Sequence, residues 1–147
     1  MELLNLPTFD YKLKKNDGKL YIFDELRKKY LILTPEEWVR QHFVHYLIKQ
    51  HQYPKSLIKL ESGLQYNQLQ KRTDIQVFDR NGSLFMIVEC KAPFVALNQG
   101  VFEQIAQYNQ VLRSPYLTIT NGMTQFCCQT NWETQSIHFL ENIPILP

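Results

Sequence analysis

Apolar and polar residues alternate in two short segments near the start of the chain, which is the pattern of half-buried β-strands. These segments are FDYKL at 9–13 and KLYIF at 19–23, and KKNDG connects them. Asp17-Gly18 is a favoured pair for a two-residue turn, so we expect an N-terminal β-hairpin. A short strand at 30–33 is expected to follow it.

The pattern then changes to apolar residues three or four positions apart, which predicts an α-helix from 35 to about 50. Thr34 can cap this helix, and Pro35 fits its first position. Glu37 stands where it would complete a capping box with Thr34. The expected buried stripe consists of Val39, Phe43, Tyr46 and Leu47.

The rest of the chain predicts strands on either side of a second helix at 99–112. The expected strands are 56–64, 74–78, 84–88, 116–120, 124–129 and 136–139. The element order αβββαβ predicts an α/β fold, with helices flanking a mixed sheet. We expect a single domain, in which the hairpin and connector of 1–33 pack on a core formed by 34–147.

Composition narrows the class of protein. The 147 residues are 44% hydrophobic with a net charge of +2, which fits one globular domain. A nucleic-acid partner would therefore be met by a local basic patch. The longest apolar stretches, such as 84–88, are too short to span a membrane, and the N-terminal residues lack the pattern of a signal peptide, so we expect none. The three cysteines include no CxxC pair, so we expect a reducing, cytoplasmic environment.

Two acids and a lysine interrupt the strand pattern of RTDIQVFDRNGSLFMIVECKAP at 72–93. If Asn81-Gly82 forms a two-residue turn, counting outward from it places Asp74 directly opposite Glu89. Their Cβ atoms would then be about 4.5–5.5 Å apart on one face of the sheet. We expect Phe85 and Ile87 on that same face. The face would then be apolar and buried at 85–87 and charged from Glu89 onward.

Two carboxylates this close repel each other unless they share a proton or a cation. Oxygen ligands in a partly open site suit Mg²⁺ or Mn²⁺. Lys91 shares the face of Glu89 and could position a metal-bound water or stabilise developing negative charge. Together these groups suit the hydrolysis of a phosphodiester bond. The alternative is structural, because acids near strand ends are often solvated and Lys91 could simply form an ion pair with Asp74 or Glu89.

Five segments in order resemble a known family. They are LTPEEWVRQ at 33–41, YPKSLIKLE at 53–61, KRTDIQVFDRNG at 71–82, IVECKAP at 87–93 and QIAQYN at 104–109. The chain resembles the PD-(D/E)xK nuclease superfamily and, more closely, the type I restriction enzyme R-subunit N-terminal domain. The resemblance implies a restriction-endonuclease-like fold and Mg²⁺-dependent cleavage of DNA. It also implies that Asp74, Glu89 and the Cys90 carbonyl bind the metal and that Lys91 is catalytic.

The resemblance suggests further site residues. Gln104 and Tyr108 match a Q-x-x-x-Y motif and lie one helical turn apart, although Tyr108 in the core and Gln104 on the surface would explain them equally well. Some relatives carry a helpful acid on the first helix, for which Glu36 and Glu37 are candidates, and Glu61 is a third. Arg40 could pair with Glu36 across one helical turn. The cations Lys71 and Arg72, just before Asp74, are candidates for DNA binding.

The partner and the process stay open at this stage. The chain holds no GxxxxGK[ST] loop, so we expect a stand-alone relative or one part of a split restriction system, and a homodimer is left open. The alternatives to a nuclease are a DNA-binding module that does not cut and a docking subunit of a larger assembly. His42 and His45 have a spacing that zinc ligands can have, but nothing completes the set, so we expect solvated or interface histidines.

Overall fold

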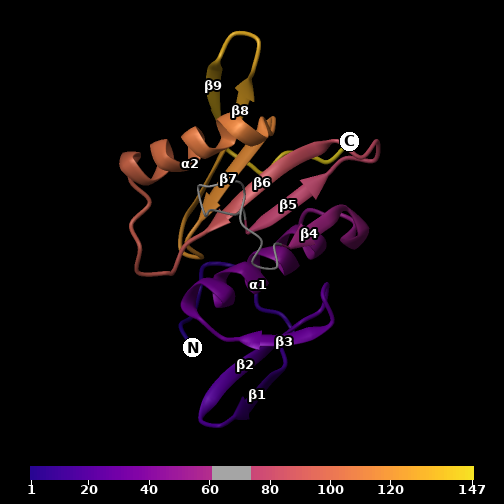
Figure 1. The fold of residues 1–147 in the computed structure, drawn as a ribbon, viewed down its shortest axis with the longest axis vertical. Coiled ribbons are helices and arrows are strands. Elements are labelled where there is room, and N and C mark those ends of the chain that lie inside the picture. Colours follow the sequence, from indigo (N-terminus) through magenta and orange to yellow (C-terminus); the bar gives the residue numbers. More distant parts are fainter. Residues whose placement is uncertain (61–73) are drawn as a thin grey trace.

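Two β-sheets with a helix between them form the molecule (Figure 1). The structure, a computed structural model, describes residues 1–60 and 74–147. The small sheet has strand order β1-β2-β3, and the large sheet has strand order β4-β5-β6-β7-β8-β9. Helix α1 packs against one face of the large sheet, and helix α2 packs against the other. The predicted α/β class with a mixed sheet is confirmed.

The small sheet contains the predicted hairpin and, within one residue of 30–33, the predicted short strand. Its strands are β1 (Leu13–Asn16), β2 (Lys19–Asp24) and β3 (Lys29–Ile32), all antiparallel. Asp17 and Gly18 both have positive φ, at 50° and 76°, as a type I′ turn requires. The prediction of a strand at 9–13 is wrong, because the turn is only two residues long and Lys14, Lys15 and Asn16, expected as part of the connection, pair with β2, so that β1 spans Leu13–Asn16.

Helix α1 (Pro35–Lys49) begins as predicted, with the Thr34 hydroxyl accepting a hydrogen bond from the Glu37 backbone N–H. The helix is buried on nearly all sides, because the N-terminal segment covers the face that the sequence pattern leaves polar. Phe9 stacks on the His45 ring with 4.0 Å between centroids and meets the His42 ring edge-on. Of the two expectations, solvated or interface histidines, the first is wrong, since both rings are buried in this aromatic cluster.

The large sheet follows the predicted order αβββαβ. Its bounds are β4 (Ile58–Leu60), β5 (Ile75–Phe78), β6 (Leu84–Cys90), α2 (Gln99–Leu112), β7 (Tyr116–Thr120), β8 (Gln125–Asn131) and β9 (Ser136–Leu140). Strand β4 is shorter than the predicted 56–64, because a 3₁₀ turn, η1 (Lys55–Leu57), precedes it, and 61–64 lie outside the described residues. Strands β6 and β7 are parallel, and α2 is the crossover between them.

Strand β6 is buried on both faces. Met86 and Val88 belong to the core under α1, whereas Ile87 packs with Ile105, Leu117 and other residues under α2. No helix in the described part of the chain is long and apolar enough to span a bilayer.

The hairpin between β5 and β6 does not have the predicted two-residue turn. The Gly82 N–H donates to the Asp79 carbonyl, and the Asp79 carboxylate accepts from the N–H groups of Asn81 and Ser83. The longer loop shifts the register by one residue, and a β-bulge at Phe85 shifts it back. Ile75 therefore still pairs with Val88, but Phe85 packs under α1 and not on the face of Ile87. The prediction for Phe85 is wrong for this reason.

Candidate active site

Asp74 stands at the end of the β5–β6 ladder, one residue before β5. The last pair of this ladder is Ile75 with Val88, so the next position outward places Asp74 beside Glu89. The Asp74 Oδ2 atom accepts a hydrogen bond from the Cys90 backbone N–H at 2.7 Å. In an antiparallel ladder the N–H and C=O of one residue point to the same neighbouring strand. The Cys90 carbonyl is therefore directed to the side on which the Asp74 carboxylate lies.

Glu89 and Lys91 flank Cys90 and point to the same face of the sheet. The Lys91 Nζ atom lies 3.7 Å from the Glu89 Oε1 atom, and the two side chains are 27% and 18% exposed. The Lys91 backbone N–H donates to the Thr120 carbonyl at 2.8 Å, which ties this end of β6 to β7. The structure thus brings Asp74, Glu89, Cys90 and Lys91 together at one end of two adjacent strands.

A buried arginine from α1 reaches the same place. Arg40 donates to both carboxylate oxygens of Glu37, and its Nη1 atom lies 3.5 Å from Asp74 Oδ1. Arg40 therefore pairs with Glu37 and Asp74 where the sequence suggested Glu36, because the cation turns inward. Gln41 continues this network, donating from Nε2 to Glu37 at 2.8 Å and to Asp24 of β2 at 3.2 Å. An unbroken polar chain thus joins the small sheet to Asp74.

The charges of this cluster are not balanced. Burial raises the pKa of Asp74, and the carboxylate of Glu37 raises it further. The Cys90 N–H and the positive charges of Arg40 and Lys91 lower the pKa of Asp74, but they do not offset the burial. Burial lowers the pKa of Arg40, yet the hydrogen bond and charge of Glu37 outweigh it, and the net pKa is raised. The two cations thus face three carboxylates, including that of Glu89.

An open groove leads to Asp74 from the small sheet. Its volume is about 610 Å³. The lining residues are Tyr21, Tyr30, Leu31, Ile32, Thr34, Glu36, Glu37, Arg40 and Asp74. One wall thus belongs to strands β2 and β3, and the other belongs to the first turns of α1 and to the acid of the hairpin. The groove gives an extended ligand access to the carboxylate cluster.

The donor set fits a hard divalent cation. Within residues 1–60 and 74–147, no three His, Cys, Asp or Glu side chains form a metal-binding group. A metal at Asp74 would therefore be held by the Asp74 and Glu89 carboxylates, the Cys90 carbonyl and water. Such an all-oxygen set with several waters suits Mg²⁺ or Mn²⁺. The excess of negative charge at Asp74 also favours a cation there.

The remaining predicted residues lie in different surroundings. Glu36 is exposed on the groove, and Glu37 is buried with its carboxylate bound to Arg40 and Gln41. Tyr108 is buried and Gln104 is exposed on α2. The candidates Glu61, Lys71 and Arg72 lie outside the described residues.

Sequence reasoning missed the roles of Arg40, Gln41 and Asp24. A signal was present in the charged and polar residues at 36, 37, 40 and 41, which recur on one side of α1 at helical spacing. This side is buried, because Glu37 and Gln41 are 5% and 2% exposed. The pattern was ambiguous, since the same residues would suit a solvated helix face.

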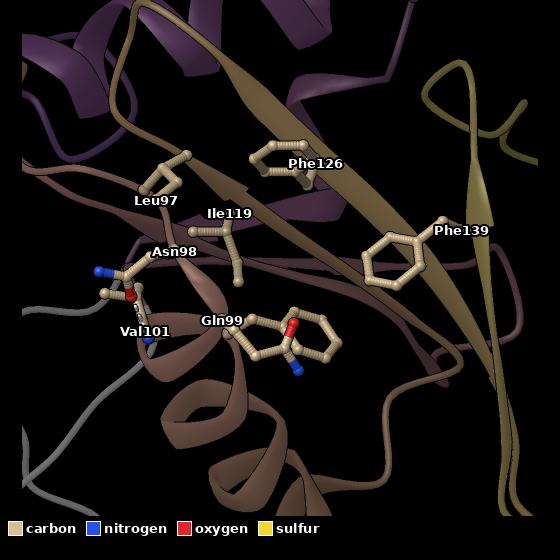
Figure 2. Close-up of a pocket in the computed structure, with 8 residues that line it drawn as sticks. Leu97, Asn98, Gln99, Val101, Ile119, Phe126 and Phe139 are labelled. Carbon is tan, nitrogen blue, oxygen red and sulfur yellow. Dashed lines mark hydrogen bonds between the residues drawn. The ribbon is translucent and has the colours of Figure 1, made fainter.

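A second hollow, between α2 and the strands β7 to β9, has no such chemistry (Figure 2). It has a volume of about 130 Å³, and its lining is apolar except for Asn98 and Gln99. In Figure 2, Phe126 and Phe139 stand around it from β8 and β9, and no charged side chain faces it. This hollow is smaller than the roughly 300–1,000 Å³ of ordinary ligand sites. The carboxylate cluster is therefore the stronger candidate for an active site.

Comparison with known protein families identifies the family of this chain. A profile of the family described as type I restriction enzyme R protein N terminus matches residues 35–144. No curated protein matches the chain. The matched span begins at the first residue of α1 and includes every strand of the large sheet. It therefore includes Arg40, Asp74, Glu89 and Lys91, but not the small sheet.

Proposed function

We propose that this chain, which belongs to the type I restriction enzyme R protein N-terminal family, is a divalent-metal-dependent DNA nuclease. Membership of the family associates the chain with restriction systems. The observation that carries the proposal is the hydrogen bond from the Cys90 N–H to Asp74. It holds one acid against the Glu89-Cys90-Lys91 segment, and this acid also lines an open groove of about 610 Å³.

In this proposal Asp74, Glu89 and the Cys90 carbonyl hold Mg²⁺ or Mn²⁺. When bound, such an ion lowers the pKa of a coordinated water and offsets negative charge on the scissile phosphate. The protein contributes a fixed arrangement of ligands. Asp74 cannot turn away without losing its bond to the Cys90 N–H, and the Arg40 guanidinium holds its other oxygen.

Lys91 supplies a positive charge beside the reacting phosphate. In the structure its ammonium lies 3.7 Å from Glu89, which orients it along the same face as the acids. From there it can donate a hydrogen bond to the attacking water or to a phosphate oxygen whose negative charge grows in the transition state. Removing one preorganised donor of this kind lowers the rate of the catalysed reaction by about 10²–10³-fold.

The proposal is tested by incubating the purified chain with supercoiled plasmid and with labelled oligonucleotides. Mg²⁺, Mn²⁺ and EDTA are compared. We expect nicks or cleavage with either metal and none with EDTA. Asp74→Asn should abolish cleavage, and Lys91→Ala should reduce it by about 10²-fold or more.

The matched control is Lys59→Ala, which removes an exposed lysine on strand β4. It should cleave as the wild type does. Cleavage that survives in Asp74→Asn or Lys91→Ala protein would show that a contaminating nuclease, or another site, does the work. Binding of DNA without product under any metal would favour a binding module that does not cut.

The second candidate is a role inside a larger restriction assembly. The family description favours it, because it names the N-terminal part of an R protein and so a piece of a longer chain. In that case the isolated chain would be inactive. Purification from its host through a tag would recover restriction subunits in fixed proportion, and cleavage would appear only in the recovered complex.

A further inference from the structure

The small sheet has two faces of different character. Cross-strand partners share a face, so Lys14, Tyr21 and Ile32 lie together, as do Phe23 and Tyr30. The opposite face carries Ile22 and Asp24, both fully buried in the interior of the molecule. The face that carries Lys14, Tyr21, Phe23, Tyr30 and Ile32 therefore points outward, and we call it the outer face of the small sheet.

Aromatic rings and lysines alternate on this outer face. The rings of Phe23 and Tyr30 are 5.1 Å apart. The Lys14 ammonium lies over the Tyr30 ring at 4.3 Å from its centroid, and the Lys12 ammonium lies over Phe23 at 5.5 Å. Every outer-face position of β1 to β3 is described, and none of them is acidic. The surface thus offers flat apolar rings inside a positive field.

The outer face is continuous with the groove of the acid cluster. Tyr21, Tyr30 and Ile32 belong to the outer face and also line the groove that ends at Asp74. A ligand lying across these strands would therefore lead to Asp74, the proposed metal ligand that lines the groove. The family match starts at residue 35, after β3, and so assigns nothing to this sheet.

We propose that the outer face of the small sheet binds a single-stranded segment of DNA and feeds its backbone to Asp74. The inference rests on the proposed nuclease function and deepens it by naming the substrate class, DNA that is unpaired beside the cut. Exposed rings on a sheet stack on bases, while lysines contact the phosphates. A duplex hides its base faces within its own stack, so it could use only the lysines.

The lysine–ring contacts on the outer face leave room for a base to replace a lysine ammonium over a ring. The side chains of Lys12, Lys14 and Tyr30 are exposed, so a base can displace the Lys14 ammonium from the Tyr30 ring. A cation over an exposed ring is held more weakly than a stacked base. The displaced lysine then lies beside the phosphate that follows the base.

The test measures binding of the whole chain to fluorescent oligo(dT) and to a mixed-sequence duplex of the same length. EDTA is present, so that cleavage plays no part. We expect tighter binding of the single strand. Tyr30→Ala should weaken it by about tenfold, as the loss of one stacked base does. Tyr30→Trp should retain the affinity, and duplex binding should change by less than about twofold in either variant.

A pair of neighbouring lysines provides the matched control. Lys14 points to the outer face, whereas Lys15 pairs with Leu20 and points to the other face of the same strand. Lys14→Gln should reduce the slope of log affinity against log salt by about 0.7, the contribution of one phosphate contact on a single strand. Lys15→Gln should leave this slope nearly unchanged. These two substitutions are on the surface, so they should not disturb the fold.

Three results would overturn the inference: duplex bound as tightly as single strand, unchanged affinity in Tyr30→Ala protein, or equal slopes for Lys14→Gln and Lys15→Gln. Should Tyr30→Ala melt at a much lower temperature than the wild type, the two lysine variants and Tyr30→Trp decide the matter. The proposed nuclease is judged separately by cleavage. If the chain cleaves DNA but the outer-face variants bind single strands as the wild type does, only this inference is overturned. If the chain binds single strands through the outer face but cleaves no DNA, only the proposed nuclease function is overturned.

Discussion

Arg40 is the cation that pairs with the carboxylates of Glu37 and Asp74. Its removal tests how much this ion-paired group stabilises the fold. The Arg40 side chain is 12% exposed, and its partners Glu37 and Asp74 are 6% and 18% exposed. Arg40→Met keeps the length and the apolar stem but leaves both carboxylates without their cation. Breaking a buried ion pair from one side costs about 3–5 kcal/mol.

The remaining donors place the expected loss at the low end of that range. Gln41 still donates to Glu37, and the Cys90 N–H still donates to Asp74. We therefore expect Arg40→Met to lower the free energy of unfolding by about 3 kcal/mol, or Tm by about 10 °C for a domain of this size. Urea denaturation at pH 7, followed by circular dichroism, measures the change, and the denaturant slope should stay constant.

A double mutant separates lost charge compensation from lost packing. If the uncompensated Glu37 carboxylate causes the loss, adding Glu37→Gln to Arg40→Met should recover part of the stability. The surface pair of Lys55 and Glu25, with 3.9 Å between its charged atoms and side chains 58% and 35% exposed, is the control. Lys55→Met should cost less than about 1 kcal/mol. The reasoning is refuted if Arg40→Met costs no more than Lys55→Met.

Three further predictions follow from burial. Asp74→Asn should fold at least as stably as the wild type at pH 7 while losing cleavage. The pKa of Asp74 is raised in the folded protein, so the charged carboxylate destabilises the fold at neutral pH. Protonation relieves this destabilisation as pH falls, and melting temperatures measured from pH 7 to pH 4 would show the difference between wild type and Asp74→Asn. Burial lowers the pKa of His45, so the stability it contributes is complete above about pH 6.5 and is lost as pH falls towards its depressed pKa. His45→Phe, which keeps the stack on Phe9, should flatten that decline in melting temperature. The pKa of Cys128 is raised to about 12, so a thiol reagent at pH 8 should label it in urea but not in the native protein, and rapid native labelling would contradict its burial.

Local pattern was enough to predict the bounds of helix α2 and strand β7. Helix α2 covers 99–112 and strand β7 covers 116–120, as the sequence predicts. Helix α2 has its apolar residues on one side, and it begins at Asn98, whose side chain accepts from the Val101 N–H. Such signals lie within a few residues of one another, so they can be identified without knowledge of the rest of the fold.

The bounds of helix α1 were predicted as well, but its surroundings could not be, because a distant segment covers it. Its pattern shows an apolar stripe beside polar residues, which indicates a helix with one solvated face. In the structure the N-terminal segment covers that face, with Phe9 on the histidines and Asp24 bonded to Gln41. Whether a glutamate on a helix is solvated or buried against an arginine depends on such tertiary contacts, which spacing alone does not specify.

The sequence predicted the alignment of Asp74 with Glu89 although it predicted the wrong type of turn between β5 and β6. The packing of β6 explains why the alignment holds with the longer loop. Both faces of this strand are buried, with Met86 and Val88 under α1 and Ile87 under α2. A shift of one residue would exchange these faces, so the two cores fix the register of the strand. The loop at 79–83 favours the other register, and the bulge at Phe85 absorbs the difference. The acids are therefore aligned by the hydrophobic packing beneath them, and the turn that first suggested their pairing is free to vary.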